Sequence, residues 1–242
     1  MKKKKRNLII GISGIVIVVA IVIVSTMIVF NKKEKIIYKE KVVYKETKSK
    51  NISDIKHNEN IVFLGDSITD FYPIDSIYMD LPIVKSGISG YTTEDILSRM
   101  DEMVYQYNPT SVFLLIGTND IMYGGDSTKE ATIENIEKII SNIKSNRKKA
   151  KIYLESIYPV NYSVNPSVVR KRDNNIINEM NDTLKEYCKK NNVTFINMSK
   201  ELQDEKGNFD AKYTDDGIHP NNLGYAKISQ VRLTYIYDIA LN

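Results

Sequence analysis

The chain has 242 residues, 42% of them hydrophobic, which is enough for one globular domain and an additional segment. The single cysteine, Cys188, excludes an intramolecular disulfide framework and a cysteine-based zinc site, and two histidines argue against a histidine-rich metal site. Residues 1–50 hold 13 basic and 3 acidic residues, which leaves 21 basic and 27 acidic residues in the rest. This acidic remainder argues against a nucleic-acid-binding surface.

The N-terminal segment has the pattern of a membrane anchor. Residues 1–6 form a basic cluster, and residues 7–30 are almost continuously apolar and uncharged. As a helix, this run would span roughly 34 Å, enough to cross a bilayer. A cleaved signal peptide is the alternative, but the run is longer than usual and no A-x-A-like cleavage site follows. We predict an uncleaved transmembrane signal anchor.

The membrane orientation rests on a nearly balanced charge count, because lysines follow the apolar run as well as precede it. The basic cluster at the extreme N-terminus resembles a signal n-region, so we expect the N-terminus inside. This orientation predicts a single-pass protein of the cell membrane with its globular domain outside.

Residues 31–57 are interpreted as a charged stalk or linker. They contain two copies of a six-residue pattern, at 34–39 and 40–45, whose period suits an extended chain better than a helix. The alternative is a strip that binds the membrane surface or a partner. Two copies are too few for a repeat domain, which favours the stalk.

Residues 58–242 alternate apolar runs with helical patterns, and no second domain boundary is visible. Apolar strands that alternate with helices predict an α/β fold, a three-layer α/β/α sandwich around a parallel sheet. The expected strands cover residues 61–64, 82–85, 111–116, 151–156 and 193–196, and the expected helices cover 93–105, 128–146, 172–191 and 223–240.

A candidate nucleophile follows the first predicted strand, in Gly65-Asp66-Ser67. This position places Ser67 at the carboxyl edge of a sheet and at a helix N-terminus, where ligands of open α/β sheets bind. No glycine follows two positions after Ser67, so the turn differs from the G-x-S-x-G elbow. Alone, the tripeptide is more typical of an ordinary strand-to-helix turn with Ser67 as the cap, and the further blocks downstream are what favour a nucleophile.

His219 is the candidate general base, because the other histidine, His57, lies in the polar linker. Asp216 precedes His219 by three residues and is placed to orient its ring, with Asp215 as the alternative. A tetrahedral intermediate also needs hydrogen-bond donors. The candidates are the Ser67 N–H, Gly90, and Asn119, which follows the third predicted strand.

Four short blocks of this chain resemble those of the SGNH, or GDSL-type, hydrolases, over about residues 58–240. In chain order they are Gly65-Asp66-Ser67, Gly87-Ile88-Ser89-Gly90, Gly117-Thr118-Asn119-Asp120 and Asp216-Gly217-Ile218-His219-Pro220.

This resemblance implies a flavodoxin-like sandwich, an acyl-enzyme mechanism through Ser67, His219 and Asp216, and no metal or other cofactor. It also implies an oxyanion hole made by Ser67, Gly90 and Asn119. Two positions depart from the family pattern. Isoleucine follows Ser67 where leucine is usual, which is a mild change, and Tyr91 stands where aspartate is common, which is expected to alter the pocket rim.

The leading functional hypothesis is a membrane-anchored serine esterase or acylhydrolase acting on envelope substrates, either O-acetylated glycans or lipid esters. The alternatives are an O-acyltransferase with the same triad and a non-catalytic binding domain. Among other polar features, Asp66 and Asp120 are expected to anchor their turns. Residues 161–174, Tyr72 and Tyr123 are candidates for the pocket lining, although aromatic and Asn-rich loops are also common on protein surfaces. Arg170, Lys171 and Arg172 are interpreted as a solvated helix start rather than an anion site.

Overall fold

The computed structural model describes residues 60–74, 78 and 81–240. The predicted basic N-terminus (1–6), membrane anchor (7–30) and stalk (31–57) lie outside these residues and stay predictions. Among the described residues, no helix is both long enough and apolar enough to cross a membrane.

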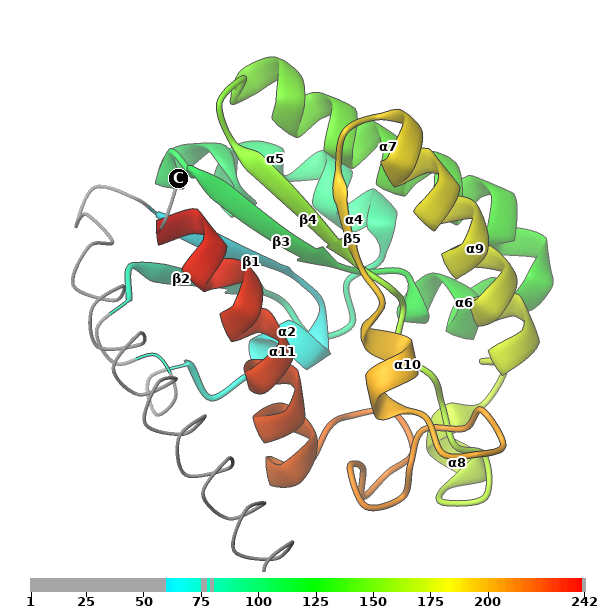
Figure 1. The fold of residues 1–242 in the computed structure, drawn as a ribbon. Coiled ribbons are helices and arrows are strands. Elements are labelled where there is room, and N and C mark those ends of the chain that lie inside the picture. The colour runs from blue at the N-terminus through cyan, green and yellow to red at the C-terminus, as the bar shows by residue number, and fades with distance from the viewer. Residues whose placement is uncertain (1–59, 75–77, 79–80, 241–242) are drawn as a thin grey trace, which may run out of the picture. The chain divides into compact units, whose positions relative to one another are not determined.

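Five parallel strands form one sheet in the order β2-β1-β3-β4-β5 (Figure 1). This is the flavodoxin-like order, and it confirms the predicted α/β fold with a parallel sheet. The switch in direction next to β1 opens a crevice at the carboxyl ends of β1 and β3. The strands are β1 (Ile61–Gly65), β2 (Ile83–Gly87), β3 (Ser111–Leu115), β4 (Lys151–Glu155) and β5 (Thr194–Ile196).

Both faces of the sheet are buried, which explains why β1 and β3 are apolar at every position but Gly65 and Ser111. Successive side chains of a strand point to opposite faces. Val62 and Leu64 accordingly belong to one core cluster, and Ile61 and Phe63 belong to the other.

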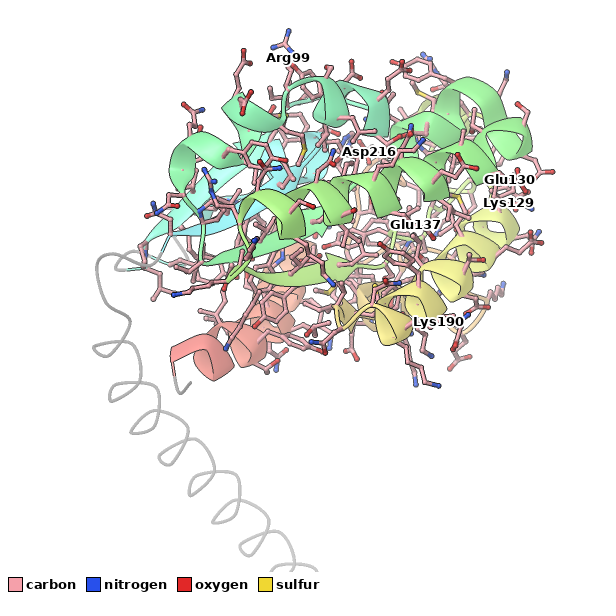
Figure 2. The ribbon with its side chains drawn as sticks, turned by 90° about the horizontal axis from the view of Figure 1, so that it is seen from above. Arg99, Lys129, Glu130, Glu137, Lys190 and Asp216 are labelled. Atoms are coloured by element: carbon pink, nitrogen blue, oxygen red, sulfur yellow. The ribbon has the colours of Figure 1, made fainter. Side chains whose placement is uncertain are left out.

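Helices cover the two faces of the sheet (Figure 1). The helices α7 (Lys129–Asn146) and α9 (Asn174–Lys190) lie side by side over the face of Val62, as seen from above in Figure 2. An ion pair between Lys129 and Glu179 (2.8 Å) joins them. The other face packs against α11 (Asn222–Ala240) and α10 (Met198–Leu202).

The expected helix over 93–105 is interrupted in the structure. It divides at Arg99 into α4 (Thr93–Ser98) and α5 (Met100–Met103), followed by the short 3-10 helix η1 (Tyr105–Tyr107). The break lets the side chains that follow Arg99 turn into the core, where Met100, Met103 and Val104 are buried.

Several short helices lie at the carboxyl edge of the sheet, and of these only the one that begins at Ser67 was anticipated. They are too short to show the 3.6-residue periodicity on which sequence prediction depends. They are α2 (Ser67–Asp70), α6 (Thr118–Gly124), η2 (Gly125–Thr128) and α8 (Pro166–Val169), together with α10.

Candidate active site

Ser67 is the first residue of α2, immediately after β1 and its cap residue Asp66. The Asp66 side chain accepts a hydrogen bond from the Ile68 N–H (3.0 Å), which confirms that Asp66 anchors this turn. Gly65 permits the tight connection, because a Cβ there would lie 2.3 Å from the Leu115 carbonyl oxygen. The turn therefore presents the serine hydroxyl at the edge of the sheet.

Asp66 is fully buried beneath this turn. Burial raises the pKa of its carboxyl group to about 6, although the Ile68 N–H and the charges of His219 and Arg172 oppose the shift. Its second carboxylate oxygen has no hydrogen-bond partner among the described residues. An unpartnered buried oxygen favours the protonated form in the same way.

The structure brings Ser67, His219 and Asp216 together from the two ends of the domain. The Ser67 Oγ lies 2.9 Å from the His219 Nε2, and the His219 Nδ1 lies 2.6 Å from the Asp216 Oδ2. Hydrogen bonds from the His219 ring and from the Ile218 and His219 N–H groups lower the pKa of Asp216, although burial opposes them. An ionised Asp216 favours a proton on the His219 Nδ1, which leaves Nε2 free to accept one.

The alternative aspartate, Asp215, does not contact the histidine. Its carboxylate accepts a hydrogen bond from the Asn221 side chain (3.1 Å). Asp216, not Asp215, is therefore the residue whose geometry suits orientation of the His219 ring.

Asn119 is the second residue of α6, whose N-cap is Gly117, and it also lines the pocket that contains Ser67. Its Nδ2 donates to the Tyr91 carbonyl oxygen (2.9 Å), and its Oδ1 accepts from the Arg172 Nη2 (2.9 Å). An amide nitrogen carries two hydrogens, so one remains for a ligand. Gly90 lines the same pocket with φ +84°, a conformation that favours glycine.

Arg172 is buried, with 7% of its surface exposed, so its interpretation as part of a solvated helix start is wrong. Its guanidinium donates to the Thr118 carbonyl and hydroxyl oxygens, to the carbonyls of Val168 and Val169, and to Asn119. These partners replace the water that a charge loses on burial. Burial lowers the pKa of Arg172, Asp66 opposes that change, and the charge of Arg170 reinforces it.

These side chains surround a pocket of about 360 Å³, within the range of small-molecule sites. Phe71, which the sequence analysis missed, forms part of its wall, and its ring centroid lies 5.3 Å from that of His219. The only sign of this role in the sequence was the position of Phe71 directly after α2. The lining residues are Ser67, Phe71, Ser89, Gly90, Asn119, Met122, Ser167, Val168, Arg170, Arg172, Ile218 and His219.

The model of the GDSL-like lipase/acylhydrolase family matches residues 63–227, a stretch that contains every residue of this pocket. The chain belongs to this family. The resemblance of the four sequence blocks to GDSL-type hydrolases is thus confirmed.

Solved structures of other proteins share the fold. A structure from Streptococcus pneumonia described as a platelet activating factor is 31% identical, with a TM-score of 0.69 over 82% of this chain and 96% of that one. A GDSL-like lipase from Bacteroides thetaiotaomicron is 26% identical, with a TM-score of 0.67 over 81% of this chain and 98% of that one.

A curated relative matches only in part. An N-acylneuraminate cytidylyltransferase from Escherichia coli is 32% identical over 168 residues, which are 69% of this chain and 38% of that protein. The chain thus spans well under half of this relative's length.

Of the other residues expected to line the pocket of this GDSL-like domain, some line it and some do not. Tyr72 is 1% exposed and lies in the core, where its hydroxyl is bonded to Tyr78 (2.8 Å) and Ser229 (2.6 Å), so its assignment to the pocket is wrong. Tyr123 is 61% exposed and is not among the lining residues. The segment 161–174 does contribute to the pocket wall.

No three His, Cys, Asp or Glu side chains within the described part of the chain gather as a metal site would require. The pocket offers a serine hydroxyl, an imidazole and an amide, and the Asp216 carboxylate binds the imidazole.

Proposed function

We propose that this protein is a membrane-anchored serine esterase that cleaves carboxylic esters through an acyl-enzyme on Ser67. The observation that carries the proposal is the hydrogen-bonded series from the Ser67 Oγ through the His219 ring to the Asp216 carboxylate. Membership of a lipase and acylhydrolase family supports the same reaction class.

In the proposed first step, the Ser67 Oγ attacks the ester carbonyl carbon while the His219 Nε2 accepts the hydroxyl proton. Asp216 holds the ring in place and stabilises the imidazolium that forms. Collapse of the tetrahedral intermediate breaks the bond to the alcohol, which takes the proton from His219. Water, deprotonated by His219, then hydrolyses the acyl-Ser67 ester and restores the serine.

The oxyanion of the tetrahedral intermediate needs donors that are in place before the reaction. We assign this role to the backbone N–H groups of Ser67 and Gly90 and to the Asn119 amide. The shared pocket wall and the remaining hydrogen of the Asn119 Nδ2 support the assignment.

The proposed substrates are esters of the cell envelope, either O-acetylated glycans or lipid esters. The predicted anchor at residues 7–30 and the predicted outward placement of the domain support this class. A pocket of about 360 Å³ suits a short acyl group with part of its alcohol.

The test uses the full chain in detergent, with p-nitrophenyl acetate and longer-chain esters as substrates and Ser67→Ala as the control. The proposal expects hydrolysis that the variant loses, and a fluorophosphonate that labels Ser67. Labelling with turnover only when a glycan acceptor is added would indicate an O-acyltransferase. A folded protein that neither hydrolyses esters nor takes the label would indicate a binding domain.

The membrane placement has its own test, protease treatment of intact cells followed by detection of the domain in the membrane fraction. The proposal expects a membrane-bound chain whose domain is lost on treatment. Full protection of the domain would overturn the outward orientation, and a chain found only outside the membrane fraction would overturn the anchor.

A further inference from the structure

The charged side chains that line the pocket around Ser67, apart from its histidine, are positive, whereas residues 51–242 as a whole carry a net negative charge. Residues 51–242 carry 27 acidic and 21 basic residues. The pocket wall nevertheless includes two arginines, Arg170 and Arg172, and no aspartate or glutamate. The nearby carboxylates are engaged elsewhere, since Asp216 binds His219 and Asp70 accepts a hydrogen bond from the Ser89 hydroxyl (2.6 Å).

The two arginines differ in what remains available to a ligand. Arg172 is buried and uses its guanidinium nitrogens on Thr118, on backbone carbonyls and on Asn119. Arg170 is exposed, and only its Nε donates, to the Ser167 carbonyl oxygen (3.1 Å). Among the described residues, no hydrogen bond or ion pair occupies its two terminal nitrogens. Arg170 therefore holds an oriented but unpaired guanidinium at the pocket.

The backbone of Arg170 is strained. This residue ends α8 with φ +55° and ψ −121°, in a region that residues other than glycine rarely occupy. Such a conformation is energetically unfavourable and is concentrated at functional sites. The strained backbone and the hydrogen bond to Ser167 together set the direction of the Arg170 side chain. An arginine that is simply solvated needs neither constraint.

We propose that Arg170 forms an anion subsite, so that the preferred substrates are esters carrying a carboxylate or phosphate group near the scissile bond. This inference rests on the proposed esterase function and narrows its substrate class. A guanidinium suits the role because its planar pair of N–H donors binds carboxylate and phosphate oxygens in a bidentate manner. Arg172, which also lines the pocket, adds a second positive charge.

The decisive experiment compares two acetyl esters of similar size and different charge, the anion para-acetoxybenzoate and the uncharged para-acetoxybenzamide, with release of acetate as the readout. Their kcat/KM ratio is measured for the full-length wild type, Arg170→Gln and Lys171→Gln. Lys171 is the matched control, because it is exposed and adjacent but does not line the pocket. We expect wild type and Lys171→Gln to prefer the anion by about tenfold, and Arg170→Gln to lose that preference.

A second variant separates the charge from the backbone strain. Glycine tolerates the positive φ at this position, so Arg170→Gly should unfold at a higher temperature than wild type while also losing the anion preference. An unchanged ratio in both Arg170 variants would overturn the subsite.

Binding without turnover distinguishes the two sources of anion and separates this inference from the esterase proposal. Full-length Ser67→Ala is titrated with benzoate and with phenyl phosphate, alone and combined with Arg170→Gln. Arg170-dependent binding of one anion identifies the source, and binding of neither, or binding that ignores Arg170, overturns the subsite. Failure of the wild type to hydrolyse any ester would overturn the esterase function instead, whatever the binding result.

Discussion

At the scale of single residues, the candidate oxyanion donor Asn119 is oriented by a side chain 53 positions away in the sequence. The Arg172 Nη2 donates to its Oδ1, so the amide nitrogen must point in the opposite direction, toward Tyr91 and the pocket. A free asparagine would exchange these two ends easily, because they differ little in shape. Arg172 is thus a positioning residue in the proposed mechanism.

We expect Asn119→Ala to lower kcat by about 10²–10³ and Arg172→Met to lower it by about tenfold, because the amide then rotates. In the double variant, the loss should equal that of Asn119→Ala alone, since Arg172 acts through that amide. Steady-state kinetics of the four proteins measures the coupling. Arg147→Met is the control, since Arg147 binds the Tyr105 carbonyl away from the pocket, and it should lower Tm without changing kcat. Additive losses in kcat would contradict this role of Arg172.

Asp66 provides a prediction about pH, because its pKa is raised to about 6 by burial. Between about pH 4 and 6, the unfolded chain loses this proton while the folded protein keeps it, so folding stability falls as pH rises. The loss is on the order of 3 kcal/mol. Asp66→Asn keeps the cap on Ile68 and removes the titration. Its Tm relative to wild type should therefore increase from about pH 4 to pH 7, and parallel Tm profiles would contradict the assignment.

At the scale of elements, the site is assembled where short helices follow the strands. Asp120, at the start of α6, accepts hydrogen bonds from the Thr93 N–H (3.2 Å) and hydroxyl (2.6 Å) at the start of α4. Its carboxylate therefore anchors the neighbouring segment at the start of α4, whereas the sequence predicted that it anchors its own turn. This contact holds the loop of Gly90 and the helix of Asn119 in one arrangement.

The end of β2 packs directly on the helix that carries the nucleophile. A Cβ at Gly87 would lie 2.5 Å from the Asp70 backbone nitrogen, so Gly87→Ala must displace α2. We expect a loss of about 1–3 kcal/mol in stability together with reduced kcat. Gly207→Ala is the matched control, because its φ is +80° but a Cβ there meets no atom within 4 Å. Gly207→Ala should lower Tm without changing kcat. Equal effects of the two variants on kcat would contradict the contact between Gly87 and α2.

At the scale of the whole molecule, a buried ion pair joins the C-terminal helix to the sheet. The Arg232 Nε lies 2.5 Å from the Glu155 Oε1, and the two side chains are 2% and 0% exposed. The Arg232 guanidinium lies 4.6 Å from the ring centroids of both Phe63 and Tyr72. Tyr158 donates to the other oxygen of Glu155 (2.6 Å). The core beneath α11 is thus partly polar and its two charges are paired, although the Arg232 Nη1 has no hydrogen-bond partner among the described residues.

Removing one charge of this pair leaves the other buried alone. We expect Arg232→Met to destabilise the fold by about 3–5 kcal/mol, equivalent to a fall in Tm on the order of 10 °C. Adding Glu155→Gln to that variant should restore part of the loss, because the unpaired charge is gone. Thermal unfolding of the three proteins measures this, and a double variant less stable than Arg232→Met would contradict it.

The sequence by itself determined the fold class, the family resemblance and the candidate residues Ser67, Asp216, His219, Gly90 and Asn119. These signals are local: an apolar strand that ends in a turn, an aspartate three residues before a histidine, and short blocks in a fixed order. Local signals can be recognised without knowing which distant residues touch.

Only the tertiary structure decided that Arg172 is buried against Asn119, that Tyr72 belongs to the core, and that Arg170 lines the pocket. It also selected Asp216 over Asp215 as the partner of the His219 ring. The burial and pairing of a charged or aromatic side chain depend on segments brought together by the sheet. Composition and spacing along the chain carry no record of those contacts.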